Sequence, residues 1–364
     1  MTIRTKLLAG IAILATGGVL LTQGLFAQGR DLSNPPVPIT IAESFDVPAA
    51  DAQTQAVVEA AQTFLATLTD EQRAEAVFPF DDNVQRANWS NFPNGAFGRA
   101  GIARGDMTED QLAALDALLG EVLSERGVRN ARMQMVADDV SATLDPGGPD
   151  FGSDFYFVSF LGEPAPDTPF VVQFGGHHLA YNATFFGPDA SFSPMLTGGE
   201  PLRIEFEGEQ VTIAIEENEA ATALLESLDD AQREAAIRGD EAINLILGPG
   251  EYGVTVASEG VAGADLSDEQ KALLEDVIAS RLGHMNADDF EAAMARAREG
   301  LEETHFGWWG PTEPLGAAYW RVTGPTLVIE YAPQDMDGDP TDHAHNMYRD
   351  PTNDYGAAWI AEAE

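Results

Sequence analysis

The chain has 364 residues, 44% of them hydrophobic, which is enough for one large core or two medium domains. Its formal net charge of −41 repels nucleic acid and anionic lipid, so we expect neither as a partner. The absence of cysteine excludes disulfides, thiol catalysis and cysteine-based zinc sites.

The first residues have the pattern of a targeting segment. Arg4 and Lys6 form a short basic region, and an apolar stretch follows over residues 7–21. This pattern is typical of a Sec-type signal peptide that is cleaved after Ala27, and the stretch is short for a membrane span. We therefore expect residues 1–27 to be removed, leaving a periplasmic or secreted protein without stable membrane insertion. The alternative is an uncleaved N-terminal anchor.

The rest of the chain is expected to form one folded domain. Residues 28–39 contain three prolines and are predicted to be a flexible lead-in, followed by a single domain over residues 40–364.

Two helix starts in the first half of the chain have counterparts in the second half. The segment 68–73 resembles 228–233, and 107–111 resembles 266–270, with an offset of about 160 residues in both cases. Typical helix N-caps stand at three of these starts: Thr69, Thr108 and Ser267. The pattern predicts an internal duplication, with one copy over about 60–200 and the other over about 220–356.

Two short apolar runs follow the second helix of each half. They cover residues 155–161 and 170–174 in the first half, and 319–322 and 327–331 in the second. Their β-branched and aromatic residues, bounded by Gly or Pro, predict strands. We therefore expect an α+β fold, an antiparallel sheet with packed helices, in which a site lies where the second strands of the halves meet.

Four of the six histidines stand in two pairs after these runs, His177 with His178 and His343 with His345. An alternating strand over 177–186 would place His178 with Asn182 on its more polar face and turn His177 toward the apolar side. His343 and His345 would share a face of an extended segment. Three imidazoles, those of His178, His343 and His345, could then converge.

Motifs that extend over nearly the whole mature chain resemble a family of exported bacterial proteins known only as a domain of unknown function. The matching features are Leu-Thr-Asp-Glu-Gln-Arg (68–73), Arg86, Trp89, Gly-His-His-Leu (176–179), Asn182, Ser-Pro-Met (193–195), Asp-Asp-Ala-Gln-Arg (229–233), Phe306, Trp308, Gly310, Tyr319, Glu330 and the ending 343–356. The resemblance implies export and a single family-wide domain, and it implies no activity. The acidic stretch 335–342 departs from the family pattern.

The histidines are interpreted as ligands of zinc or a similar divalent transition metal. Zinc that activates water needs three protein ligands and one open position. The candidate ligands are His177, His178, His343, His345 and Asp350. The candidate catalytic groups are Asp354 or Glu330 as general base and Arg349 as the group that holds a substrate anion. The alternatives are a metal-free polar site and purely structural histidines.

These residues favour an exported metalloprotein, with metal-dependent hydrolysis as its chemistry. The alternative is a non-catalytic periplasmic protein that binds a metal or another ligand in the same pocket. The substrate or ligand, a small molecule or a polymer, is not specified by the sequence. A third hypothesis makes the histidines structural and an aromatic cluster a glycan-binding cleft. That cluster comprises Phe306, Trp308, Trp309, Tyr319 and Trp320.

Overall fold

The computed structural model describes residues 32–335 and 338–362, so the expected signal segment lies outside the described residues. The chain divides into two units, 1–33 and 34–364. No helix in the described part of the chain is long and apolar enough to cross a membrane.

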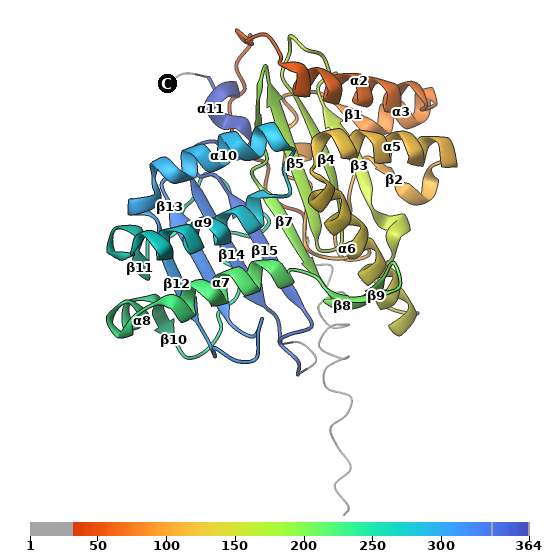
Figure 1. Cartoon of the computed structure of the whole chain (residues 1–364). Helices are drawn as coiled ribbons and strands as arrows, with labels where there is room; N and C mark the ends of the chain where they lie inside the picture. Colours follow the sequence, from red (N-terminus) through yellow and green to blue (C-terminus); the bar gives the residue numbers. More distant parts are fainter. Residues whose placement is uncertain (1–31, 336–337, 363–364) are drawn as a thin grey trace, which may run out of the picture. The chain divides into compact units, whose positions relative to one another are not determined.

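A 13-stranded sheet runs through the second unit (Figure 1). From one edge to the other its strands are β1 (Val77–Phe78), β3 (Phe157–Leu161), β4 (Phe170–Gly176), β5 (Leu179–Phe186), β7 (Met195–Gly199), β15 (Ala344–Arg349), β14 (Leu327–Pro333), β13 (Tyr319–Gly324), β12 (His305–Trp309) and β10 (Ile237–Gly239). Three short strands, β2 (Ile102–Ala103), β6 (Asp189–Ser191) and β11 (Val261–Ala262), pair with β3, β5 and β12. Two strands form a separate small sheet, β8 (Arg203–Phe206) and β9 (Glu209–Thr212).

The sheet is mostly antiparallel, with parallel pairing only of β1 with β3 and of β10 with β12 among the described strands. In the middle, β7 pairs with β15 from Tyr348↔Met195 to Ala344↔Gly199. We call this pairing the seam. Because β7 belongs to the first half of the chain and β15 to the second, the seam joins the two halves.

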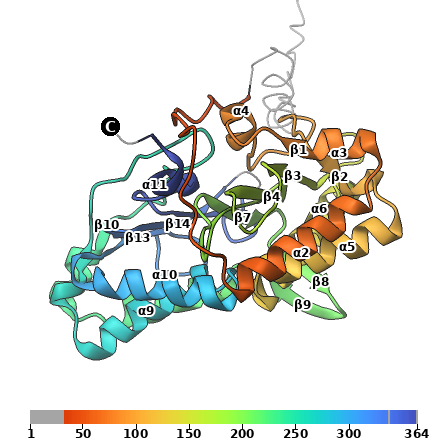
Figure 2. The same cartoon turned by 90° about the horizontal axis from the view of Figure 1, so that it is seen from above.

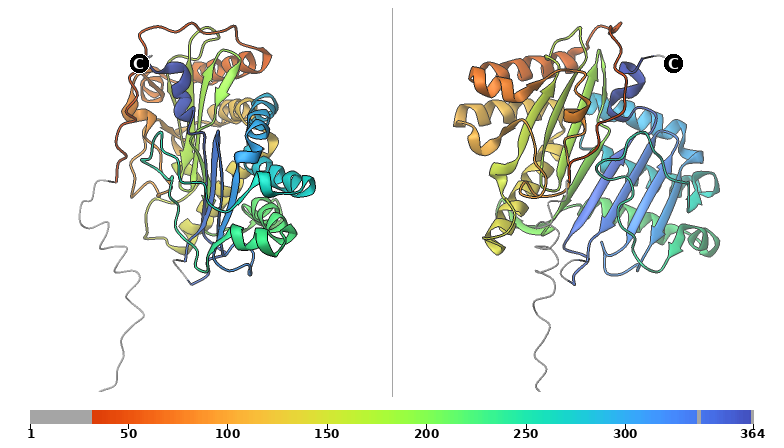
Figure 3. Two further views of the ribbon diagram at one scale, coloured as in Figure 1. Left: turned by 90° about the vertical axis from the view of Figure 1, so that its left-hand side faces the viewer. Right: turned by 180° about the vertical axis from the view of Figure 1, so that it is seen from behind.

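Helices cover one face of the sheet, while mainly irregular segments cross the other (Figure 3). The α-helices of the described residues, on either face of the sheet, are α2 (Ala52–Ala66), α3 (Asp70–Ala76), α4 (Asn83–Arg86), α5 (Glu109–Val122), α6 (Glu125–Leu144), α7 (Ile215–Ser227), α8 (Asp230–Ala236), α9 (Asp268–Leu282), α10 (Ala287–Glu299) and α11 (Ala357–Ile360). On the helical face, α2 lies beside α5 and α9 beside α10, whereas the short α4 and α11 lie on the opposite side of the sheet (Figure 2).

The expected helix starts are confirmed. Thr69, Thr108 and Ser267 each cap a helix, and in each case a glutamine three residues later bonds back to the backbone of the cap residue. This reciprocal capping box satisfies donors that have no partner within the helix.

Hydrophobic side chains pack on both faces of the sheet. The alternation expected in β5 is confirmed, because Leu179, Tyr181, Ala183 and Phe185 all join the large core under the helices. On the opposite face a smaller cluster gathers around the seam, where Trp89 packs with neighbours that include Leu196 and Met347. The segments around residues 83–100 and 240–260 cover this second face, and the sheet is therefore buried on both sides.

Two expectations are wrong in detail. His177 and His178 do not belong to a strand, because β4 ends at Gly176 and β5 begins at Leu179. The second strands of the halves, β4 and β14, do not meet, since β5, β7 and β15 lie between them.

The aromatic cluster proposed as a glycan cleft is part of the core. Phe306, Tyr319 and Trp320 are fully buried, and Trp308 and Trp309 are at most 8% exposed. They offer no open surface to a sugar.

Candidate metal centre

The first histidine pair forms a two-residue hairpin turn between β4 and β5. Gly176 pairs with Leu179, which leaves His177 and His178 as the turn. His178 has a φ of 56°, a left-handed conformation that favours glycine and costs a side-chain-bearing residue about 1 kcal/mol or more. The turn brings the two imidazoles together, with ring centroids 3.8 Å apart and the ring planes tilted by 31°.

The second pair stands at the beginning of β15. His343 precedes the strand, and His345 pairs with Gly198 of β7 across the seam. The two histidines share a face because strand side chains alternate. Since β7 also pairs with β5, the hairpin turn at the start of β5 lies close to this end of the seam.

The fold thus brings the three expected imidazoles together. His178 Nε2 lies 3.1 Å from His343 Nε2. The His345 ring centroid is 5.0 Å from that of His178 and 5.2 Å from that of His343. One ring nitrogen of each residue lies within 4.8 Å of those of the other two. We call His177, His178, His343 and His345 the histidine cluster.

Gly198 makes room for this convergence. A Cβ at this position would lie 2.3 Å from the backbone oxygen of Ala344 and 3.4 Å from Cδ2 of His178. The first distance is a clash with backbone, which cannot move aside without disturbing the pairing of β7 with β15.

Three polar residues that sequence reasoning missed surround the cluster. Asp138 of α6 lies 2.6 Å from His177 Nδ1, and Asn91 Nδ2 lies 3.2 Å from His345 Nε2. Glu200, directly after β7, places Oε1 3.7 Å from His343 Nδ1. His177, His178 and Glu200 form a second group whose donor atoms lie within 4.8 Å of one another.

The cluster is shielded from water, and three of its imidazoles, those of His178, His343 and His345, are held neutral. Its four histidines are 4–8% exposed. Burial, reinforced by the neighbouring histidines, lowers the pKa of His178 and of His345 well below the ordinary value, and burial lowers the pKa of His343 to about 4. At neutral pH these rings therefore carry an unprotonated nitrogen, which is the form that binds a metal ion.

A comparison with known protein families gives a match that spans the whole histidine cluster. A family model described as "Protein of unknown function (DUF3500)" matches residues 50–357. The chain belongs to this family. No curated protein and no solved structure matches the chain significantly. The resemblance inferred from the sequence is thereby confirmed, and membership of DUF3500 assigns no chemistry to the histidine cluster.

The other predicted site residues lie elsewhere in this DUF3500 chain. Arg349 stands at the far end of β15, four residues from His345, which is roughly 13 Å along an extended strand. There it forms a buried ion pair of 2.5 Å with Asp354, which also accepts a bond from Ser193. Asp350 accepts hydrogen bonds from Thr352 and is absent from both groups of candidate metal ligands in the described residues.

Glu330 is also separated from the cluster. It lies in β14 opposite Met347, and its carboxylate accepts hydrogen bonds from the backbone of Ile246 and Leu247 and from the Tyr319 hydroxyl. These contacts anchor the 240–260 segment onto the sheet. The structure thus assembles the four histidines but not Asp350, Asp354, Glu330 or Arg349 around them.

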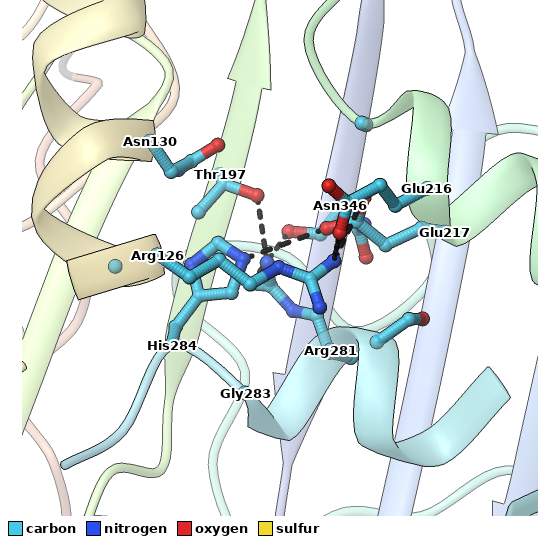
Figure 4. A network of polar contacts seen from close by, with 12 residues as sticks. Arg126, Asn130, Thr197, Glu216, Glu217, Arg281, Gly283, His284 and Asn346 are labelled. Atoms are coloured by element: carbon cyan, nitrogen blue, oxygen red, sulfur yellow. Dashed lines mark hydrogen bonds and ion pairs between the residues drawn. The ribbon is translucent and has the colours of Figure 1, made fainter. Parts of the chain in front are cut away.

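A second buried polar network lies on the helical side of the seam (Figure 4). Arg281 of α9 is fully buried and donates to Thr197 Oγ1 at 2.7 Å, to the Met195 carbonyl and to the Asn346 carbonyl. Its guanidinium therefore bridges β7 and β15. Nearby, His284 contacts Glu217 at 3.5 Å. This network bonds the two halves together on the face opposite Trp89.

Proposed function

We propose that the protein binds a divalent transition metal ion through His178, His343 and His345. The observation that carries the proposal is the 3.1 Å separation of His178 Nε2 and His343 Nε2, with His345 beside both. At metal–nitrogen distances of about 2.0–2.1 Å, two ligands of a tetrahedral ion lie about 3.3 Å apart. The ring nitrogens of His178 and His343 are thus close to the spacing that one ion requires.

The donor set favours zinc or a similar ion. Three neutral imidazoles without thiolate suit zinc, copper, nickel or iron, whereas calcium and magnesium prefer oxygen ligands. Burial adds to the affinity because the ligands need not lose a proton at neutral pH.

The chemistry that this site supports best is hydrolysis, in which a water molecule activated by the metal ion attacks a polar substrate. His178, His343 and His345 would hold the ion and would leave one coordination position for water, whose pKa the ion would lower toward neutrality. Glu200, whose side chain is 33% exposed, stands at the edge of the cluster and is the carboxylate best placed to act as general base. It replaces the remote Asp354 and Glu330 in this role.

Non-catalytic metal binding is the second candidate function, and the burial of the cluster favours it. The histidines are 4–8% exposed, and Asn91 contacts both His345 and the backbone of His178. A closed centre suits storage or structural binding, whereas a catalytic ion keeps an open position. Azide added to the cobalt(II)-loaded protein would change the visible spectrum only if a position is open.

Elemental analysis tests the metal proposal. The mature protein, purified without chelator or immobilised nickel, is expected to retain at least one equivalent of transition metal, and the His343→Ala/His345→Ala variant is expected to lose it while remaining folded. His305→Ala is the matched control because His305 lies on β12, remote from the seam in the strand order. Absence of metal after incubation with zinc, copper, iron and manganese would reject the proposal.

Export is proposed from residues 1–27, whose basic start and apolar stretch have the signal-peptide pattern. The mass of the mature chain isolated from the periplasm or medium tests this, since cleavage after Ala27 removes those residues.

We also propose that the two halves arose by duplication, which would place the metal at the junction of the copies. The order of elements supports this. A hydrogen bond joins Gln72 to Gln111 at the first two capping boxes, and the same bond joins Gln232 to Gln270 in the second half. Each half also ends in a parallel edge pair, β1 with β3 and β10 with β12.

A further inference from the structure

We propose that the cluster holds a second metal ion, bound by His177 and Glu200, with His178 between the two ion positions. The proposal rests on the first ion proposed above, and in the two-ion centre Glu200 is a ligand and not the general base. Two groups of donors support it, one of His178, His343 and His345 and one of His177, His178 and Glu200, each with its donor atoms within 4.8 Å of one another. The two groups share only His178.

His177 is oriented as a ligand by Asp138. The 2.6 Å contact between His177 Nδ1 and Asp138 Oδ1 is buried, with side chains 5% and 2% exposed. Donation from Nδ1 to this carboxylate makes Nε2 the ring nitrogen that can face an ion. Imidazoles that bind metals commonly donate their other nitrogen to a carboxylate in this way, which fixes the ring and raises its basicity.

The His343 ring faces both groups, with Nε2 toward His178 and Nδ1 toward Glu200. His343 Nδ1 is buried and makes no hydrogen bond in the described structure, and the nearest carboxylate oxygen, Glu200 Oε1, lies 3.7 Å away. That gap is too long for a hydrogen bond. Because a neutral imidazole has a single lone pair, a His343 that binds the first ion through Nε2 keeps its proton on Nδ1, and the second ion is therefore assigned to His177 and Glu200.

The charges at the second position differ from those at the first. The first position has three neutral imidazoles, whereas the second adds the Glu200 carboxylate and has Asp138 behind His177. These two carboxylates offset the repulsion between two dications at short range. The second position, which includes the partly exposed Glu200, is expected to exchange its ion faster than the first.

Metal stoichiometry tests the proposal. Apo-protein is loaded with Zn²⁺ and freed of excess metal, and bound zinc is then measured per chain. We expect two equivalents in the unmodified protein, one in His177→Ala and one in Glu200→Gln. His345→Ala should lose the first ion, and Asp138→Asn should weaken the second by about 10- to 100-fold without affecting the first. Controls are Glu207→Gln and His305→Ala, which change residues outside both groups and should retain two.

A second measurement detects the neighbouring ions without relying on the number of metal equivalents per chain. In the Cu²⁺-loaded protein two neighbouring ions couple magnetically, so the spin-resonance signal should be smaller than the copper content requires. His177→Ala should restore the full signal for its single ion. Circular dichroism and the unfolding midpoint show whether each variant is folded.

The outcomes separate the two proposals. One equivalent in the unmodified protein, lost in His345→Ala, overturns the second site and leaves the proposed function intact. Two equivalents that persist in both His177→Ala and Glu200→Gln overturn the assignment of ligands. No bound metal at all overturns both proposals.

Discussion

His178 Nε2 lies 3.1 Å from His343 Nε2, and the two residues are 165 positions apart in the sequence. The contact exists because β7 and β15 pair at the seam, which brings the β4–β5 turn to the start of β15. Anything that shifts the register of the seam by one residue turns every side chain of the moved strand to the other face of the sheet. The geometry of the cluster is therefore coupled to the stability of the seam.

Gly198→Ala should disturb both the pairing at the seam and the geometry of the histidine cluster. The added Cβ would stand 2.3 Å from the Ala344 carbonyl oxygen, so β7 and β15 must separate locally. We expect the free energy of unfolding to fall by about 1–3 kcal/mol, together with weaker zinc binding. Chemical denaturation and zinc titration check this. Gly120→Ala, where no atom lies within 4 Å of the new Cβ, should leave both unchanged or slightly raise stability. Equal behaviour of the two variants would contradict the prediction.

Asn91→Ala should accelerate metal exchange without unfolding the protein. The Asn91 side chain covers His345 Nε2, while its backbone carbonyl, which the substitution keeps, accepts the bond from His178. Stability should change by less than about 1 kcal/mol, because the residue is only half-buried. The rate at which a chelator removes zinc from the loaded protein measures the effect. Asn94→Ala on the same segment is the control, and similar rates for both variants would argue against a covering role for Asn91.

Arg349→Met should destabilise the protein but leave its metal content unchanged. The substitution removes one partner of a buried ion pair and leaves the Asp354 charge without its 2.5 Å neighbour. Breaking such a pair typically costs about 3–5 kcal/mol. Denaturation curves and elemental analysis of the folded fraction test this. Loss of metal in a variant of normal stability would return Arg349 to the site that the sequence suggested.

The unfolding free energy should depend on pH through His284, which is 1% exposed and contacts the Tyr181 hydroxyl and Glu217. Burial lowers the pKa of His284 from 6.5 to about 4. The contact with Glu217 raises this pKa in part, whereas the positive charges of Arg281 and Arg126 lower it further. Between these values the unfolded chain binds the proton and the folded chain does not. The stabilisation is therefore complete above pH 6.5 and is lost as the pH falls toward 4, by roughly 3 kcal/mol for this residue.

His284→Gln should reduce that dependence, because glutamine does not titrate. Urea unfolding of the metal-free protein between pH 4 and 7 measures the slope, to which His178, His343 and His345 also contribute. The control is His305→Gln on β12, a less buried position. A His284→Gln slope identical to that of the control would show that His284 is already protonated in the folded state.

Local chemistry accounts for what the sequence predicted correctly. Thr69, Thr108 and Ser267 cap helices because a hydroxyl one residue before the first turn bonds a backbone amide, whatever the rest of the fold does. The alternation from Leu179 to Phe185 likewise assigns one face of β5 to the core. His343 and His345 fall on one side of β15 for the same reason.

The order of strands and the surroundings of the cluster were decided by tertiary structure. Asp138 and Glu200 reach the histidines only because α6 packs on the sheet and β7 pairs with β15, and no local pattern encodes either contact. Arg349 shares a motif with His345 but is carried to the other end of β15, since an extended strand advances about 3.3 Å per residue. Neighbouring positions in a motif thus mark a site only when the strand direction keeps them together, and that direction is fixed by long-range pairing.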